Sequence, residues 1–150
     1  DLILSQLAHS NIEEVYVIQR GSGLLMGSAS LHPTMNKDVI AGMFTAIKSF
    51  VEDAFQRGQE ELEMIQYETY QIFIQNFHSY YIAVAINGSL SANERDKLAN
   101  DLLTFAEKEL KKLVRTIDNK TNLRIRKKLE QYFILPQQEQ KEQLSKSTKA

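Results

Sequence analysis

The chain has 150 residues, of which 43% are hydrophobic and 25% charged, as in an ordinary globular domain with a short appendage. No apolar run reaches the roughly 18 residues that a membrane-spanning helix requires, and no basic stretch precedes a long apolar segment as in a signal peptide. The absence of Cys excludes disulfides, thiolate metal sites and a Cys nucleophile, and it fits a reducing compartment. Because the first residue is Asp, we expect the sequence to be part of a longer protein.

The charge is unevenly distributed along the chain. Residues 1–107 contain 6 Lys and Arg against 14 Asp and Glu, which gives a charge of −8. Residues 108–150 contain 12 against 5, which gives +7. The small net charge of −1 therefore conceals an acidic body with a basic C-terminal part.

The first predicted element after a short apolar cluster at residues 2–7 is a hairpin. Residues 12–20 are rich in β-branched and aromatic side chains, which is typical of a strand. The turn Arg20-Gly21-Ser22-Gly23 follows, and residues 24–31 form the return strand.

A helix over residues 36–55 organises the rest of the chain. Asn36 is a suitable N-cap, and Asp38 places negative charge in the first turn, where the helix dipole favours it. One apolar stripe recurs at three- and four-residue steps and contains Ile40, Met43, Ile47, Phe50, Val51 and Ala54. A second row is small or polar and contains Gly42, Ala46, Ser49 and Asp53.

Gly42 requires an explanation, because Gly inside a helix costs about 1 kcal/mol relative to Ala. It can let the helix lie close on a sheet. Alternatively, it can let another backbone approach, such as the same helix of a second subunit. The sequence leaves both explanations open.

Three strands with short connections follow, over residues 62–68, 70–77 and 80–86. The last of them, YYIAVAI, is almost continuously apolar, so we expect it in the centre of a sheet with both faces covered. Asn87-Gly88 ends this meander.

Two helices are predicted at the C-terminal end. The capping box Ser91-Ala92-Asn93-Glu94 opens the first, which runs to about residue 117. Its expected buried stripe contains Leu98, Leu102, Phe105, Ala106, Leu110, Leu113 and Ile117. The second covers residues 121–133, with apolar positions at Leu123, Ile125, Leu129, Tyr132 and Phe133. We expect Pro136 to end it.

The predicted order is (α)ββαβββαα. This order indicates an α+β domain with a five-stranded antiparallel sheet and helices on both faces. The main domain is expected over residues 1–118, a basic amphipathic C-terminal helix over 119–135, and a disordered polar tail over 136–150.

Three stretches resemble the roadblock/longin superfamily, which has a profilin-like fold. They are the hairpin VYVIQRGSGLLMGSAS, the helix DVIAGMFTAIKSFVEDAF, and the meander IQYETYQIFIQNFHSYYIAVAING with the helix that follows it. Together they span residues 12–117, and they are hydrophobic patterns without a catalytic signature. The N-terminal apolar cluster resembles the roadblock branch, whereas the additional C-terminal helix resembles longins.

The resemblance implies a non-enzymatic dimerisation platform and a partner or regulator of small Ras-like GTPases. In roadblock proteins the central helix and the strand after it often form the dimer interface. The candidate interface residues here are Gly42, Ala46, Ser49 and Asp53 on the helix, and Leu62 and Met64 on the strand.

No catalytic constellation is visible in the sequence. His9, His32 and His78 are isolated and form neither an H-x-x-x-H nor an H-E-x-x-H pair. The Arg20-Gly-Ser-Gly turn lacks the Lys-Ser/Thr of a P-loop and leads into a strand. We therefore expect no enzymatic activity, no metal and no cofactor.

The strongest compositional outlier is a basic segment between residues 108 and 128. Its candidate surface residues are Lys111, Lys112, Arg115, Arg124, Arg126, Lys127 and Lys128. The first interpretation is a solvated helix face that rests on the acidic body, and the second is a contact to anionic lipid headgroups. Nucleic acid comes third, because no aromatic residues interleave with the charges.

The sequence thus predicts a cytoplasmic interaction module within a larger protein, with itself as one partner in a homodimer. A small GTPase is a second candidate partner, and an anionic membrane surface is a third. The alternative from another class is a PAS-like small-ligand sensory domain, since PAS-like domains share a five-stranded sheet. A sensor requires a cavity with polar anchoring groups, and the sequence does not identify one.

Overall fold

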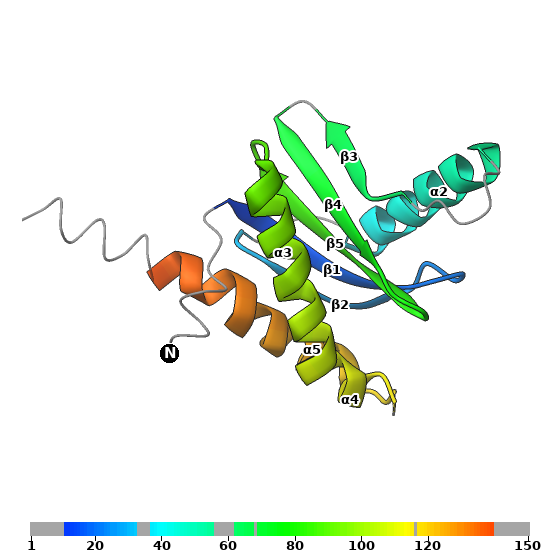
Figure 1. The fold of residues 1–150 in the computed structure, drawn as a ribbon. Helices are drawn as coiled ribbons and strands as arrows, with labels where there is room; N and C mark the ends of the chain where they lie inside the picture. The colour runs from blue at the N-terminus through cyan, green and yellow to red at the C-terminus, as the bar shows by residue number, and fades with distance from the viewer. Residues whose placement is uncertain (1–10, 33–36, 56–61, 68, 116, 140–150) are drawn as a thin grey trace, which may run out of the picture.

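The computed structural model describes residues 11–32, 37–55, 62–67, 69–115 and 117–139. The predicted N-terminal helix, the N-cap Asn36 and residues 140–150 of the predicted tail lie outside these ranges. Five strands form one antiparallel sheet in the order β2-β1-β5-β4-β3 (Figure 1). Their bounds are β1 (Ile12–Gln19), β2 (Leu25–Ser30), β3 (Met64–Tyr67), β4 (Tyr70–Asn76) and β5 (Tyr80–Asn87).

The predicted hairpin is confirmed as β1 and β2. Gly21 and Gly23 both have positive φ in the connecting turn, at 86° and 73°, a conformation that Gly adopts without steric cost. The Gln19 N–H donates to the Leu24 carbonyl at 2.8 Å and closes the turn. The pairing register shifts between Val17 and Ile18, which pair with Gly27 and Leu25, so the additional residue Met26 marks a bulge in β2.

The central position predicted for the apolar strand YYIAVAI is also confirmed. β5 pairs with β1 on one side and with β4 on the other. Residues 80–84 and Ile86 are buried, as a strand covered on both faces requires.

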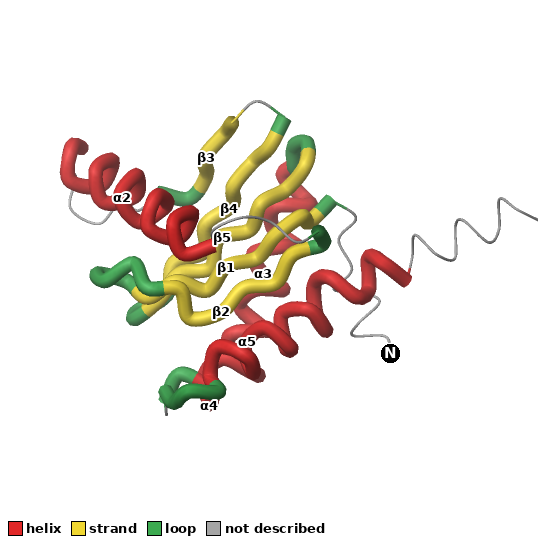
Figure 2. The backbone as a smooth tube through the Cα atoms, turned by 180° about the vertical axis from the view of Figure 1, so that it is seen from behind, coloured by secondary structure: helices red, strands yellow, loops and turns green. Residues whose placement is uncertain are grey.

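Helices cover both faces of the sheet (Figures 1 and 2). One face carries α3 (Ala92–Phe105), the π-helical turn η1 (Ala106–Leu110) and α4 (Lys111–Leu113) as successive segments. The same face carries α5 (Thr121–Leu129) with its π-helical extension η2 (Glu130–Ile134). The other face carries α2 (Lys37–Phe55). The α+β class and the arrangement of its helices are therefore as predicted.

The N-terminus of α3 has the predicted capping box. The Ser91 hydroxyl accepts from the Glu94 N–H at 3.1 Å, and the Glu94 carboxylate accepts from the Ser91 N–H at 3.0 Å. Two backbone donors that have no partner within the helix are thus satisfied.

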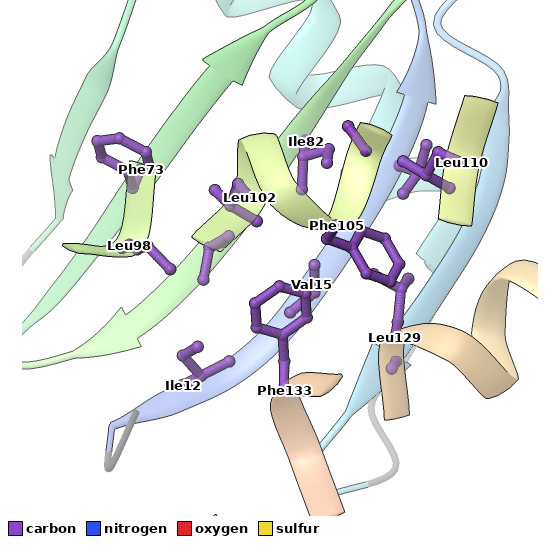
Figure 3. Close-up of a cluster of buried hydrophobic side chains, with 14 of the residues drawn as sticks. Ile12, Val15, Phe73, Ile82, Leu98, Leu102, Phe105, Leu110, Leu129 and Phe133 are labelled. Atoms are coloured by element: carbon purple, nitrogen blue, oxygen red, sulfur yellow. The ribbon is translucent and has the colours of Figure 1, made fainter. Parts of the chain in front are cut away.

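The main core lies between the sheet and the two C-terminal helices (Figure 3). Leu98, Leu102, Phe105, Ala106 and Leu110 of the predicted stripe are buried, whereas Leu113 is partly buried and Ile117 is exposed. On the second helix, Ile125, Leu129 and Phe133 are buried, Tyr132 is partly buried and Leu123 is exposed. The Phe105 and Phe133 rings meet edge to face at 5.3 Å and join the two helices.

The last helix does not end at Pro136 as predicted, but continues to Glu139. In a regular α-helix, a proline ring clashes with the carbonyl four residues earlier. Here the preceding turn η2 is π-helical, and the Leu135 N–H donates to the Glu130 carbonyl. The wider turn changes which carbonyl the proline meets, so the helix passes it. The predicted tail boundary at residue 136 was therefore too early.

Candidate functional site

Helix α2 packs on the sheet through a face that the apolar pattern did not indicate. Among the α2 side chains whose burial the structure describes, the buried ones are Ala41, Phe44 and Lys48. The Phe44 ring meets Tyr16 of β1 edge to face, with 5.8 Å between ring centroids. This face is displaced around the helix from the stripe formed by Met43, Ile47 and Phe50.

Polar contacts complete the attachment of α2. The Lys48 ammonium pairs with Glu52 at 2.8 Å and lies 5.6 Å from the centroid of the Tyr81 ring. The Glu52 carboxylate also accepts from the Leu62 N–H at 3.1 Å. A hydrogen bond of 2.7 Å joins the hydroxyls of Thr45 and Tyr81.

The environment of Tyr81 changes its acidity. Burial raises the pKa of Tyr81 above its usual value, and the charge of Glu52 raises it further. The hydrogen bond with Thr45 opposes this rise. The hydroxyl therefore stays protonated near neutral pH and can serve as a fixed structural contact.

The apolar stripe of α2 is largely on the outside. Phe50 is 73% exposed, Met43 is 48% exposed, and Ile47 is exposed as well. These are large side chains, and they follow one another along a single helix face. Such a contiguous exposed group is characteristic of a surface that another molecule covers.

The row of small residues lies beside this stripe. Gly42, Ala46, Ser49 and Asp53 are all exposed. A Cβ added to Gly42 would meet no atom within 4 Å, so Gly42 does not serve close packing of α2 on the sheet. The first explanation of Gly42 is therefore wrong, while approach by another backbone stays a prediction.

An apolar groove of about 760 Å³ runs between α2 and the sheet. Met43, Phe44 and Ile47 line it from the helix. The sheet contributes Ile65, Tyr70, Ile72 and Ala85, with Glu13, Glu14 and His32 also among the lining residues. Tyr16 lines the groove too, and its buried hydroxyl has no hydrogen-bond partner within the part of the chain that the structure describes. Sequence periodicity could not reveal this groove, because it depends on the angle at which α2 crosses the sheet.

Strand β3 forms one edge of the sheet, as its predicted role in an interface requires. Leu62 precedes β3, and both backbone groups of Leu62 already form hydrogen bonds within the domain. Its N–H donates to Glu52, and its carbonyl accepts from the Asn76 side chain at 3.2 Å. Of the two predicted strand residues, Met64 thus lies in the edge strand itself, while Leu62 joins β3 to α2 and β4.

The predicted basic surface lies on the side of the sheet opposite to α2, on and just beyond α4 and on α5. Lys111, Lys112, Arg115, Arg124, Arg126 and Lys127 are exposed, and Lys128 is half-buried. Four of these side chains form ion pairs: Lys111 with Glu107, Arg124 with Asp118, Arg126 with Glu130, and Lys128 with Glu109. Much of the surface is thus a solvated helix face whose acidic partners lie within the same segment. The role of the surface stays a prediction.

Within the described ranges, no group of three His, Asp or Glu side chains is placed to hold a metal ion. Among the helices that the structure describes, none combines the length and apolar character of a membrane span.

No protein-family model matches the sequence, and no curated protein matches it either. Among solved structures, three MglB proteins are similar to this chain. The gliding protein MglB of Thermus thermophilus has a TM-score of 0.48 at 11% identity, over 66% of this chain and 84% of the other. An MglB with a tetrameric arrangement has a TM-score of 0.49 at 12% identity, over 66% and 84%. Myxococcus xanthus MglB has a TM-score of 0.49 at 13% identity, over 69% and 91%.

Over the described residues, the order of the elements agrees with the predicted order of hairpin, helix, meander and C-terminal helices. The hairpin β1-β2 and the meander β3-β4-β5 form the sheet, α2 connects them along the chain, and α3 and α5 pack on the face opposite α2.

Proposed function

We propose that this domain is a non-enzymatic, dimerising protein-interaction module, with the outer face of α2 and the edge strand β3 as its interface. The observation that carries the proposal is the exposed stripe of Met43, Ile47 and Phe50 beside an apolar groove. Monomeric soluble proteins rarely expose contiguous apolar patches of this kind, and larger ones mark interaction sites.

A second copy of this chain is a suitable partner, because the face carries both a projecting side chain and a groove that can receive one. A two-fold interface must be self-complementary, since the same surface patch is used by both subunits. The projecting Phe50 and the groove lined by Met43 and Ile47 lie on the same side of the sheet. The protruding residue of one copy can therefore enter the groove of the other, while Gly42 and Ala46 allow the two helices to approach.

The test compares three substitutions of exposed apolar residues. Phe50→Asp introduces a charge into the proposed interface, whereas Leu103→Asp places the same charge on α3, where Leu103 is 47% exposed. Light scattering should give twice the 17.2 kDa chain mass for the unmodified chain and for Leu103→Asp. Phe50→Asp and Ala46→Arg should give the monomer mass. A monomer in all four proteins would refute the dimer.

A small Ras-like GTPase is the proposed protein partner. The support is the roadblock/longin resemblance of residues 12–117, together with a fold that matches it. Small GTPases recovered with the domain from its source organism should be tested for binding in both nucleotide states, followed by exchange and hydrolysis assays. If no GTPase binds in either nucleotide state, the partner class is wrong, even where the dimer is confirmed.

The sensory alternative has one observation in its favour. Tyr16 lines the groove, and its buried hydroxyl, which has no hydrogen-bond partner among the described residues, is a polar group of the kind that can orient a ligand. Native mass spectrometry of the purified domain distinguishes the two functions. A stoichiometric small molecule that is lost with Tyr16→Phe would favour the sensor over the interaction module.

A further inference from the structure

The segment that runs from η1 through α4 into α5 has a high density of positive charge. Residues 107–130 contain nine Lys or Arg and four Asp or Glu, a net charge of +5. The four acids are all engaged in ion pairs with basic side chains of the same segment. The segment therefore keeps a net positive charge that its own acidic side chains do not neutralise.

Five cations of the segment remain without an ion pair among the described residues: Lys108, which lies on η1, and four cations near the connection between α4 and α5. Lys112, Arg115, Lys120 and Lys127 form no ion pair with any residue that the structure describes, and all four are exposed. Lys112 and Arg115 lie at and just beyond α4, Lys120 immediately precedes α5, and Lys127 lies two helical turns into α5. They border the connection between the two helices, which lie next to each other at one end of the molecule (Figure 1).

Two apolar side chains project from the same connection. Ile117 is 62% exposed, and Leu123 in the first turn of α5 is 41% exposed. We call these two residues, together with Lys112, Arg115, Lys120 and Lys127, the basic corner. Both apolar residues were expected in the buried stripes, so their exposure is a property of the folded turn.

The turn that presents Ile117 is held by several hydrogen bonds. The Asp118 N–H donates to the Thr121 hydroxyl at 2.8 Å, and the Asp118 carboxylate accepts from the Lys120 N–H at 2.8 Å. Arg124 adds an ion pair with Asp118 at 3.5 Å. The side chain of Thr121 is itself buried, which anchors the turn to the domain. The exposed Ile117 therefore lies next to a turn that these hydrogen bonds and the ion pair hold in place.

We propose that the basic corner docks on an anionic membrane surface. Lysine and arginine clusters attract acidic lipid headgroups, and exposed aliphatic side chains beside them enter the boundary between headgroups and acyl chains. The basic corner supplies both components within one connection. It lies on the face of the sheet opposite to α2, so this inference is independent of the proposed dimer.

A nucleic acid fits the basic corner less well. Binding of single strands relies on aromatic side chains on which bases stack. The aromatic residues of this helix pair are engaged elsewhere: Phe105 and Phe133 are buried, and the Tyr132 hydroxyl donates to Glu109 at 3.0 Å. Exposed Ile117 and Leu123 contribute nothing to phosphate binding, whereas they are useful at a lipid surface.

The first experiment tests the charges by sedimentation with vesicles. Binding to phosphatidylcholine vesicles that contain phosphatidylserine should be strong at low salt and weaken as salt rises, because screening shortens the range of exposed charges to about 10 Å at 0.1 M. The double variant Arg115→Gln/Lys127→Gln should lose about fivefold in affinity for each removed charge. The matched double variant Arg95→Gln/Lys97→Gln removes two exposed cations from α3 and should bind like the unmodified chain.

The second experiment tests the apolar component. Ile117→Ser/Leu123→Ser keeps every charge and should weaken binding to the same vesicles severalfold. The control Leu103→Ser changes an exposed leucine outside the basic corner and should have no effect. Thermal unfolding of each variant separates lost binding from lost folding.

Three results would overturn the inference. Equal affinity for vesicles of pure phosphatidylcholine would exclude an electrostatic contact. Equal loss in the two double variants would show that net charge, and not the basic corner, controls binding. Binding of single-stranded nucleic acid with no binding of anionic vesicles would assign the surface to that partner instead.

Discussion

The side-chain amide of Gln137 hydrogen-bonds both backbone groups of Ile12, which lies at the start of β1. Its Oε1 accepts from the Ile12 N–H at 3.0 Å, and its Nε2 donates to the Ile12 carbonyl at 2.9 Å. Nε2 also donates to the Phe133 carbonyl at 2.9 Å. Gln137 is buried, so this amide joins the C-terminal helix to the beginning of the sheet in place of a neighbouring strand.

Loss of the Gln137 amide should destabilise the domain markedly. Gln137→Ala leaves two buried backbone groups of Ile12 without partners, so we expect the free energy of unfolding to fall by about 2–4 kcal/mol. Urea denaturation measures the change. The neighbouring Gln138 is exposed, and Gln138→Ala should stay within about 0.5 kcal/mol of the unmodified chain. Equal effects of the two substitutions would show that the hydrogen bonds contribute nothing.

The close approach of α5 to β2 gives a second prediction. A Cβ added to Gly27 would lie 2.4 Å from Cγ2 of Ile125 and 2.7 Å from its Cβ. Gly27→Ala should therefore destabilise the domain by about 1–3 kcal/mol through overpacking. Ile125→Ala alone should cost about 2–5 kcal/mol through the cavity that it leaves.

The double variant Gly27→Ala/Ile125→Ala tests whether the two residues act through their contact. Because the shorter side chain relieves part of the overlap, the double variant should lose less stability than the two single variants together. Additive losses would mean that the backbone of β2 or α5 shifts independently of this contact.

The buried tyrosines predict loss of stability at high pH. Burial, with a smaller contribution from the charge of Glu107, raises the pKa of Tyr80 to about 12. In the unfolded chain the pKa is about 10, so between pH 10 and 12 the folded state binds more protons, and stability falls as pH rises. Burial also raises the pKa values of Tyr81 and Tyr132, which act in the same direction.

Chemical denaturation at a series of pH values measures this dependence. Tyr80→Phe should remove a part of the loss on the order of 1–2 kcal/mol and leave the remainder to the other tyrosines. An unchanged pH profile in Tyr80→Phe would show that its hydroxyl is as accessible when folded as when unfolded.

The sheet could be predicted from sequence because its signals are local. The glycines of the first turn, the alternation in the hairpin and the continuous apolar run of β5 depend on neighbouring residues only. The capping box of α3 is equally local, since Ser91 and Glu94 satisfy each other. These elements were located to within a residue or two.

The orientation of α2 could not be predicted in the same way. Its buried face contains Lys48, whose charge is compensated by Glu52 and by the Tyr81 ring. Because this lysine interrupts the apolar pattern of the buried face, that face does not show helical apolar periodicity. The exposed stripe of Met43, Ile47 and Phe50 does show it. The pattern therefore identified a helix correctly, but pointed to the surface that lies outside the core.

The attachment of the C-terminal helix to β1 depends on residues that are distant in sequence. Gln137 is one polar residue in a polar segment, and only its contact with Ile12 gives it a structural role. The same holds for the groove, whose walls come from α2 and from four strands. Neither feature leaves a local signal in the sequence.

Gly42 provides a test that separates the folded chain from its assembly. Since a Cβ at this position meets no atom within 4 Å, Gly42→Ala should raise the free energy of unfolding by up to about 1 kcal/mol through higher helix propensity. In a dimer with two α2 helices in close contact, the added methyl group would push the helices apart. The same substitution should therefore weaken dimerisation while it stabilises the monomer.

Two measurements and one control decide this prediction. Urea denaturation at protein concentrations below the dimer Kd measures the free energy of unfolding of the monomer. Analytical ultracentrifugation measures the dimer Kd itself. Asn100→Ala is the control, because Asn100 is exposed inside α3 and gains helix propensity without lying near α2. It should raise stability and leave the Kd unchanged. A Kd that Gly42→Ala also leaves unchanged would show that no second backbone approaches Gly42, and the interface would then have to be sought along Phe50 and β3 alone.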